Sequence, residues 1–156
     1  MCLVVVENRL YVVNVGDSRA LLLNGTEIVD LAQSHKPTVA TEKERIDKTE
    51  GKVIGGLLMG SLAVSRAFGD LAFKKFNSGL ISEPDIRVVS LGPECDFLVV
   101  GCDGLYEEFP DQDISEWILS NTLKRIPLDQ ITKDLVEESI QRGSTDNVTA
   151  ILVKFD

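Results

Sequence analysis

The first thirty residues hold four apolar runs, and the joints between the runs are only two or three residues long. The stretch "CLVVVENRLYVVNVG" contains two runs rich in β-branched residues that meet at residues 7–9, and "RALLLNGTEIVDLA" contains two more that meet at Asn24-Gly25. An Asn-Gly pair between apolar runs is a strong hairpin signal, because both turn residues must accept a positive φ. The opening of the chain therefore predicts antiparallel β-structure.

The middle of the chain adds a helix and further strands. The stretch "TEKERIDKTEG" predicts a short helix, with Thr41 and Glu44 as a capping box and Gly51 at the C-terminal end. The glycine-rich residues 55–69 predict another strand pair, and residues 70–82, which show no clean period, predict an exposed excursion. Two more strands, "DIRVVSLG" and "DFLVVGCDG", are expected on either side of a Gly-Pro break.

The last third of the chain predicts a helix pair and a final strand. Asp113 with Glu116 forms a second capping box, and the face of this helix is expected to carry Ile114, Trp117 and Ile118. A helix over residues 128–142 should bury Ile131, Leu135 and Ser139, and residues 148–155 should form a strand. This order predicts an α/β protein of the α+β type with mainly antiparallel sheet, in one domain over residues 1–156.

Composition and charge narrow the classes of partner. The 156 residues are 44% hydrophobic and 26% charged, which is typical of a globular domain. The net charge of −9 disfavours nucleic acid and anionic membranes as partners. Cys2, Cys95 and Cys102 form no CxxC pair, which argues against a disulfide framework and a zinc ribbon. With apolar runs of only strand length and no signal-peptide pattern, the sequence predicts a soluble cytoplasmic or nuclear protein.

Two acidic residues stand at the ends of apolar runs. Asp103 follows "FLVVGC" and precedes a glycine, and Asp146 precedes Asn147 and the final strand in "STDNVTAILVKF". Carboxylates in such places suit hard cations such as Mg²⁺ or Mn²⁺, and two of them brought together repel unless a cation lies between them. Taken singly, each residue is explained at least as well by a turn in which the side chain bonds its own backbone.

Two other patterns favour structure over chemistry. A nucleophilic serine in "VGDSRA" would need a general base, and the one histidine, His35 in "SHKPT", carries no signature of such a partner. We therefore interpret this stretch as a turn with an Asp17–Arg19 salt bridge. The glycines of residues 55–60 match no phosphate-binding loop.

Six stretches, taken together, resemble the metal-dependent protein phosphatases of type 2C. They are "LYVVNVGDSRALLL", "SHKPTVATEKERIDKTEGKV", "GSLAVSRAFGD", "SEPDIRVVSL", "DFLVVGCDGLYEEF" and "RGSTDNVTAILV", and they occur in the order of that family over almost the whole chain. The resemblance implies an antiparallel β-sandwich of two sheets flanked by helix pairs. It also implies an enzyme that hydrolyses phosphoserine and phosphothreonine in phosphoprotein substrates.

The resemblance assigns roles to the two strand-end carboxylates. In the family a water bridging two Mn²⁺ or Mg²⁺ ions attacks phosphorus, and Asp103 and Asp146 fall on aspartates that bind these ions. Two metals can lower the pKa of the shared water and clamp the attacking and leaving oxygens. Asp146 would then serve as a turn residue and as a ligand at once.

The resemblance covers only the C-terminal portion of the family's domain. The part that supplies a phosphate-binding arginine, an acidic residue and an Asp-Gly-His-Gly motif has no counterpart in residues 1–156, which makes this a partial domain without the general acid. We therefore expect weak or absent metal binding and no activity for the chain alone, with no catalytic residue assigned. Ser34 stands where many members have a third-metal aspartate, and Cys102 and Glu107 replace a commoner serine and aspartate.

Two further expectations follow from this partial match. A non-catalytic pseudophosphatase-like binding or regulatory module is the alternative function. Strands that lack their family partners leave open sheet edges and an uncovered apolar face, which predicts a homodimer or association with an N-terminal segment.

Overall fold

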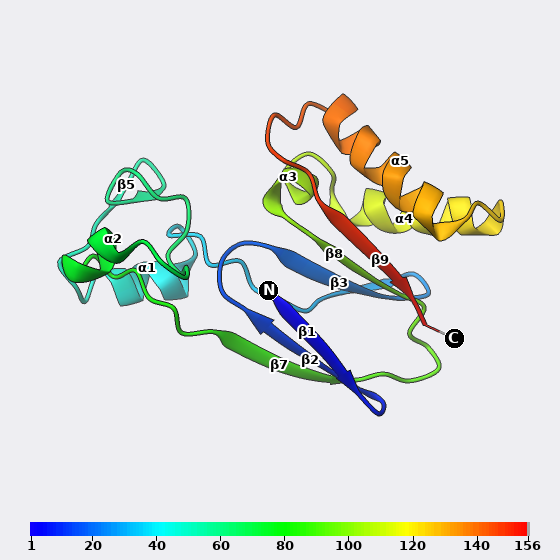
Figure 1. Ribbon diagram of the computed structural model, residues 1–156, viewed down its shortest axis with the longest axis horizontal. Helices are drawn as coiled ribbons and strands as arrows, with labels where there is room; N and C mark the ends of the chain where they lie inside the picture. The colour runs from blue at the N-terminus through cyan, green and yellow to red at the C-terminus, as the bar shows by residue number, and fades with distance from the viewer. Residues whose placement is uncertain (156) are drawn as a thin grey trace.

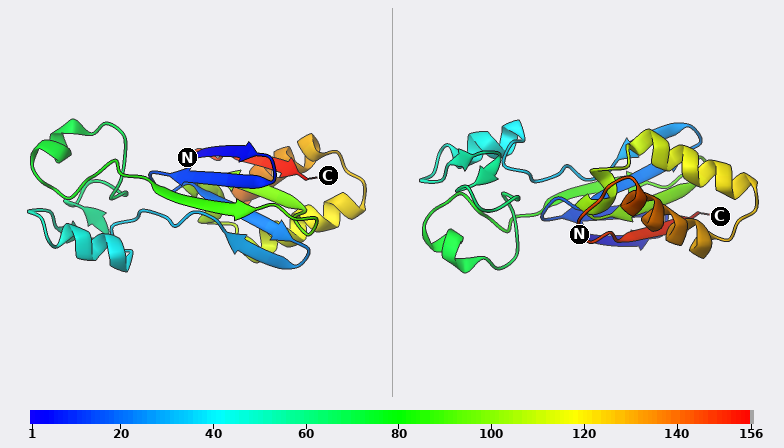
Figure 2. Two further views of the ribbon diagram at one scale, coloured as in Figure 1. Left: turned by 90° about the horizontal axis from the view of Figure 1, so that it is seen from below. Right: turned by 90° about the horizontal axis from the view of Figure 1, so that it is seen from above.

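A computed structural model describes residues 1–155 of the chain. Two antiparallel sheets stack face to face, helices lie against the outer side of one sheet, and residues 37–83 form a lobe at one end of the stack (Figures 1 and 2). No helix within the described range is both long and apolar enough to cross a membrane.

Both sheets are built from neighbouring antiparallel strands. The first sheet has the order β1-β2-β7, formed by β1 (Cys2–Val6), β2 (Arg9–Asn14) and β7 (Asp85–Ser90). The second has the order β4-β3-β8-β9, formed by β3 (Arg19–Asn24), β4 (Glu27–Asp30), β8 (Phe97–Gly101) and β9 (Ala150–Lys154). The predicted hairpins at both joints of the first thirty residues are confirmed, and Glu7 and Gly25 adopt the positive φ angles that such turns require.

Alternate residues of the strands fill the space between the two sheets. Leu10 and Val12 of β2 pack against Ala20 and Leu22 of β3 and Leu98 of β8, and all five are buried. Burial of a leucine side chain stabilises the fold by about 1.5–3 kcal/mol. The strand period of two therefore converts the apolar runs into one layer of core between the sheets.

The opposite residues of the second sheet face a helical layer. It consists of α3 (Asp103–Tyr106), α4 (Asp111–Leu123) and α5 (Leu128–Gln141). Leu21 and Leu23 of β3 lie in one buried cluster with apolar side chains of all three helices, among them the predicted Ile114, Ile118, Ile131 and Leu135. The expected fold class, an antiparallel sandwich with helices against it, is confirmed.

The predicted cap of α4 is wrong. The helix begins at Asp111 after Pro110, and no side chain caps it. A proline with fixed φ suits the start of a helix, so the chain turns helical two residues before Asp113. Asp113 instead pairs with Arg142 at the end of α5, at 2.6 Å.

The outer side of the first sheet carries an apolar surface. The pairing register places alternate residues of the three strands there: Cys2, Val4, Val6, Tyr11, Val13, Ile86 and Val88. We call this set the outer apolar face. Val4, Val6, Ile86 and Val88 are 48%, 52%, 66% and 51% exposed. Within residues 1–155 no helix covers it, because α4 and α5 lie against the second sheet (Figure 2).

The lobe is largely irregular and holds a small core of its own. Its elements are α1 (Ala40–Ile46), β5 (Val53–Ile54), β6 (Leu57–Leu58) and α2 (Leu71–Lys75), and its core is Ile46, Leu58 and Leu80. The strand pair predicted over residues 55–69 is therefore wrong: only β6 lies in this range, and its partner β5 precedes it. The excursion predicted at 70–82 contains α2.

The predicted ends of the first helix are also corrected. Because α1 begins at Ala40, Thr41 lies inside the helix and cannot cap it. Gly51 lies beyond the helix, and a Cβ at this position would lie 1.9 Å from the carbonyl oxygen of Ser78. Gly51 is thus required for close packing of two lobe segments rather than for ending the helix.

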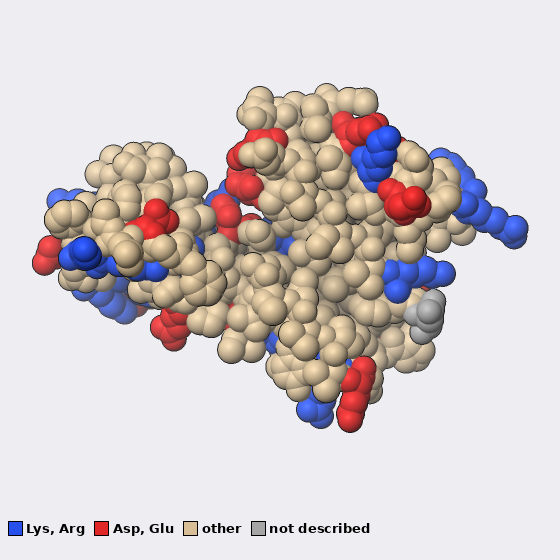
Figure 3. Space-filling model, viewed as in Figure 1, with Lys and Arg blue, Asp and Glu red and all other residues tan. Residues whose placement is uncertain are grey.

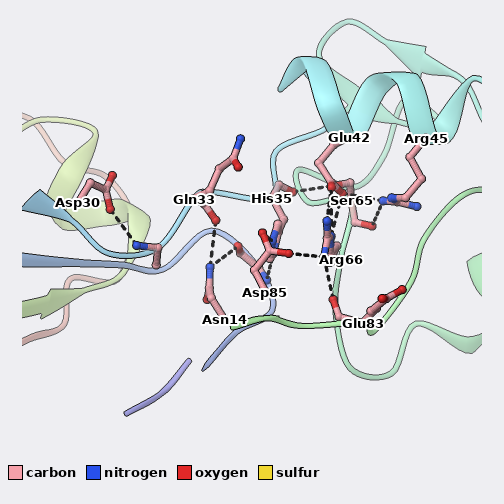
Figure 4. A network of polar contacts seen from close by, with 12 residues as sticks. Asn14, Asp30, Gln33, His35, Glu42, Arg45, Ser65, Arg66, Glu83 and Asp85 are labelled. Carbon is pink, nitrogen blue, oxygen red and sulfur yellow. Dashed lines mark hydrogen bonds and ion pairs between the residues drawn. The ribbon is translucent and has the colours of Figure 1, made fainter. Parts of the chain in front are cut away.

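A buried polar network joins the lobe to the sandwich (Figure 4). Glu42 of α1 accepts hydrogen bonds from Arg45, Ser65 and Arg66. Arg66 also donates to Asp85, the first residue of β7, at 3.0 Å. The network therefore fixes α1 and the chain around residue 66 to the start of a sandwich strand.

Candidate metal centre

Asp103 lies one residue beyond the end of strand β8 and is the first residue of helix α3. Its Oδ1 accepts a hydrogen bond from the backbone N–H of Gly104 at 3.0 Å, and its side chain is half-buried. One carboxylate oxygen is thus held by the backbone, and the other is available to a ligand.

Asp146 lies in the loop between α5 and β9. The backbone N–H of Asn147 donates to its Oδ1 at 2.6 Å, and the residue is exposed. This is the local side-chain-to-backbone bond expected of an aspartate before a strand. As at Asp103, the second oxygen is available.

The two carboxylate-bearing segments lie at the same end of the second sheet. Strands β8 and β9 are antiparallel neighbours with Gly101 opposite Ala150, so one leaves the sheet where the other enters. Beyond the strands the segments stay in contact, because a Cβ added to Gly104 would lie 2.5 Å from the carbonyl oxygen of Asn147. A glycine is therefore required next to Asp103 for this approach. The structure brings the segments together, and the role of the carboxylates as metal ligands stays a prediction.

A cavity of about 290 Å³ lies beside Asp103. Its lining comes from three parts of the chain: Asp17, Arg19, Ser34, Lys36, Asp103, Tyr106 and Glu107. Acidic side chains gather on the side of the sandwich that faces the lobe, close to α3 (Figure 3). The cavity therefore combines three carboxylates with one lysine.

Charge repulsion and burial act on this group of side chains. Burial and the neighbouring Asp103 raise the pKa of Asp17. A salt bridge of 2.5 Å from Lys36 to Glu107 raises the pKa of the lysine, which also interacts with the other two carboxylates. The Lys36 ammonium group therefore supplies part of the positive charge that this acidic cavity needs.

Asp17 is a candidate site residue that the sequence analysis missed. The predicted Asp17–Arg19 salt bridge is wrong, since Arg19 pairs with Asp30 at 2.6 Å and with Asp111 at 2.7 Å. These partners lie at the end of β4 and the start of α4, so Arg19 ties the helical layer to the sheet. The missed signal is positional, because Asp17 follows an apolar strand just as Asp103 does.

His35 supports this site from within the core. Its Nδ1 accepts a hydrogen bond from the backbone N–H of Gly16 at 3.1 Å, and its Nε2 lies 3.1 Å from the carboxylate of Asp85. The ring is buried, with both nitrogens engaged. His35 therefore holds the turn that carries Asp17 and is not placed as the base of a catalytic serine.

The carboxylate groups near the cavity are the type of ligand that a hard cation prefers, but too few of the described ones lie close together to hold one. Asp17, Asp103 and Asp146 offer carboxylate oxygens, which Mg²⁺ and Mn²⁺ prefer. Among residues 1–155, however, no three His, Cys, Asp or Glu side chains are arranged closely enough to hold a metal ion. The described residues therefore provide part of a metal centre.

Ser34 gives a first testable prediction. Its hydroxyl lines the cavity, is buried, and makes no hydrogen bond within residues 1–155. A neutral hydroxyl is a weak ligand, so we expect no third-metal site in the natural chain and a gain of Mn²⁺ binding in Ser34→Asp. Titration calorimetry with Mn²⁺ measures this gain, with Ser61→Asp on the exposed lobe surface as control. Equal binding by both variants would show that position 34 does not match the family's aspartate.

Known proteins that are similar in sequence to this chain include protein phosphatases of type 2C. The Protein phosphatase 2C family model matches residues 1–148. The probable protein phosphatase 2C 22 of Arabidopsis thaliana is 36% identical over an alignment of 152 positions, which covers 92% of this chain and 39% of that protein. The human integrin-linked kinase-associated serine/threonine phosphatase 2C is 34% identical and matches 99% of this chain and 43% of its own length.

Solved structures agree with these relatives. A phosphatase from a pathogenic strain of Toxoplasma gondii superposes with a TM-score of 0.85 at 29% identity, over 94% of this chain and 48% of its own. The serine-threonine phosphatase 2C of Toxoplasma gondii gives a TM-score of 0.81 at 25% identity, over 99% and 57%. The chain thus spans about two fifths of the curated relatives named above. With its motifs, its sheets and its relatives in agreement, the chain belongs to the protein phosphatase 2C family.

Proposed function

We propose that residues 1–156 are the C-terminal part of a metal-dependent protein serine/threonine phosphatase domain that acts on phosphoproteins. The contact between the Asp103 and Asp146 segments carries this proposal, because it brings two carboxylate-bearing segments together at the end of one sheet. Family membership supports the same chemistry. Three free cysteines support a reducing, cytoplasmic or nuclear location.

The chain's own residues would hold one side of the metal centre. Asp103 and Asp146 each keep one oxygen bonded to a backbone N–H, which fixes the direction of the other oxygen. When bound, Mn²⁺ or Mg²⁺ would lower the pKa of a bound water and stabilise the charge on a phosphoryl group. Lys36 would balance the charge of the neighbouring Glu107 and leave the two aspartates to bind the cation.

One observation favours the alternative of a non-catalytic binding or regulatory module. Lys36 already places an ammonium group among the carboxylates of the cavity, where it offsets their negative charge without a metal. A binding module needs only a stable sandwich with an exposed surface, and the charge compensation by Lys36 would be enough to keep such a sandwich stable. A measurement of cation binding distinguishes the two functions, because only the phosphatase requires a bound cation.

The test uses Mn²⁺ and aspartate variants. The natural chain is expected to bind Mn²⁺ weakly, and Asp103→Asn or Asp146→Asn should weaken binding about tenfold or more, because each removes an anionic ligand. Asp47→Asn, on the exposed surface of the lobe, is the matched control. Electron paramagnetic resonance of free Mn²⁺ measures the binding. Equal affinity in all four proteins would contradict the proposed ligands.

Activity is tested on the same samples. Hydrolysis of a phosphopeptide by the chain alone is expected to be undetectable, since no phosphate-binding arginine or general acid has been assigned in it. Addition of the N-terminal half of a relative should restore Mn²⁺-dependent hydrolysis, and Asp103→Asn should abolish that gain. A natural chain that hydrolyses the peptide by itself would show that the residues present here suffice.

A further inference from the structure

Cys102 connects the two carboxylate-bearing segments. It lies between the last residue of β8 and Asp103, and its thiol donates a hydrogen bond to the carbonyl oxygen of Asn147 at 3.0 Å. The sulfur also accepts one from the backbone N–H of Thr149 at 3.2 Å. A third bond runs from the backbone N–H of Cys102 to the carbonyl oxygen of Thr149 at 3.3 Å.

These bonds hold the two segments together at residues directly adjacent to Asp103 and Asp146. Cys102 immediately precedes Asp103, and Asn147 immediately follows Asp146. On the other side of Asp103, Gly104 packs against Asn147. The carbonyl oxygen of Gly104 also accepts a hydrogen bond from the hydroxyl group of Ser139 in α5 at 2.9 Å. The separation of the two aspartates is thus determined from both sides of Asp103.

We propose that Cys102 is a positioning residue of the metal centre, and that its thiol sets the separation at which Asp103 and Asp146 offer their oxygens to one cation. This inference rests on the proposed function. The thiol acts as donor and acceptor at once, toward a carbonyl group and toward an N–H group of the same loop. A serine hydroxyl can make both bonds, whereas an alanine methyl group can make neither.

The position of Cys102 separates this role from general stability. Its side chain is partly exposed just beyond the end of β8, whereas Cys95 is buried in the core between the sheets. Truncation of Cys102 therefore opens no large cavity, and we expect Cys102→Ala to remain folded.

The test follows Mn²⁺ binding by nuclear magnetic resonance of the ¹⁵N-labelled chain. A shared Mn²⁺ ion should broaden the amide signals of residues 103–105 and 145–148 at the same concentration. In Cys102→Ala the concentration for half-broadening should rise about tenfold, as for loss of a residue that orients metal ligands, and the two segments should no longer respond together. Cys102→Ser should restore the natural response, and Cys2→Ala on the outer apolar face should not change it.

A reversible modification provides a second route. In a Cys2→Ser background, methyl methanethiosulfonate converts the Cys102 thiol to a methyl disulfide and releases methanesulfinate, which removes the donor proton. The modified chain should lose affinity like Cys102→Ala and regain it on addition of dithiothreitol. This arm keeps the test valid if the alanine variant fails to fold.

The outcomes distinguish this inference from the proposed function. Natural affinity in both Cys102→Ala and the modified chain would overturn the positioning role and leave the metal ligands intact. No broadening of either segment in the natural chain would instead overturn the assignment of Asp103 and Asp146 as ligands.

Discussion

Replacement of Glu42 by glutamine is expected to lower the free energy of unfolding at neutral pH by about 3 kcal/mol. The Glu42 side chain is 3% exposed and receives ion pairs of 2.6 Å from both Arg45 and Arg66. A neutral amide of the same size leaves the half-buried guanidinium group of Arg45 without its carboxylate and leaves Arg66 with Asp85 alone, and a buried charge that loses its partner is costly. Urea denaturation of the natural chain and the variant measures the difference.

The pH dependence gives this prediction a second readout. Burial alone would raise the pKa of Glu42, but hydrogen bonds from Arg66, Arg45 and Ser65 outweigh it and lower the pKa from 4.5 to about 2. Because the folded pKa lies below the unfolded one, protonation favours unfolding. The stabilisation is complete above pH 4.5 and is lost as the pH falls towards 2. It amounts to about 3 kcal/mol, at 1.36 kcal/mol for each pKa unit.

A matched control lies on the same helix. Glu44 pairs with Lys48 at 2.8 Å, and both side chains are mostly exposed. Glu44→Gln should therefore leave the free energy of unfolding and its pH dependence unchanged within error, because exposed ion pairs contribute little. If Glu42→Gln behaves like this control between pH 5 and pH 2, the ion pairs of Glu42 are not the source of the stability that the fold loses in acid.

The isolated chain is expected to self-associate at micromolar concentration rather than remain a monomer. Its outer apolar face is uncovered, and the edge strands β1 and β9 are unpaired on their outer sides within the described residues. An apolar groove of about 440 Å³ lies between these two edges, lined by residues of both, among them Leu3, Val5 and Ile151. Apolar faces and free edges of this kind promote association. Light scattering coupled to size-exclusion chromatography measures the molar mass.

Variants show which surface is responsible. Val4→Lys with Val88→Lys places charges on the outer apolar face and should shift the chain to a monomer, because lysines oppose sheet-to-sheet contact. Leu123→Lys, at the exposed end of α4, is the control and should not change the mass. Addition of an N-terminal half from a relative should also suppress association if it covers the same surface. A natural chain that stays monomeric up to millimolar concentration would refute this prediction.

The sequence pattern predicted the sandwich better than it predicted the lobe. Strand β2 follows a two-residue alternation in which every second side chain is buried, and β3 is a continuous apolar run that is buried on both faces of its sheet. The lobe has no such period, since its small core is filled from short, irregular segments. The predicted starts of α1 and α4 were wrong for a related reason. The residues at these starts, Val39 and Pro110, act through backbone conformation and not through a capping side chain.

The site was predictable in its strand-end carboxylates and not in its surroundings. Asp103 and Asp146 stand next to the strands that bring them together, so chain position located them. The cavity that includes Asp17 and Lys36 depends on tertiary packing of three separate segments, which no local pattern encodes. The bonds of the Cys102 thiol were unpredictable for the same reason, because their partners lie more than forty residues away.

The insertion of the lobe between β4 and β7 has a consequence for the order of folding. Strand β2 must find β7 across the whole lobe, as Asn14 pairs with Asp85, and closing a long loop costs conformational entropy before any contact is formed. A lobe that folds first removes much of this cost, because it brings together the chain at its entry and its exit, where the side chains of His35 and Asp85 lie 3.1 Å apart. The first sheet can then close as if its strands were joined by a short connection. The rate at which the sandwich assembles is thus linked to a unit that contributes no strand to it.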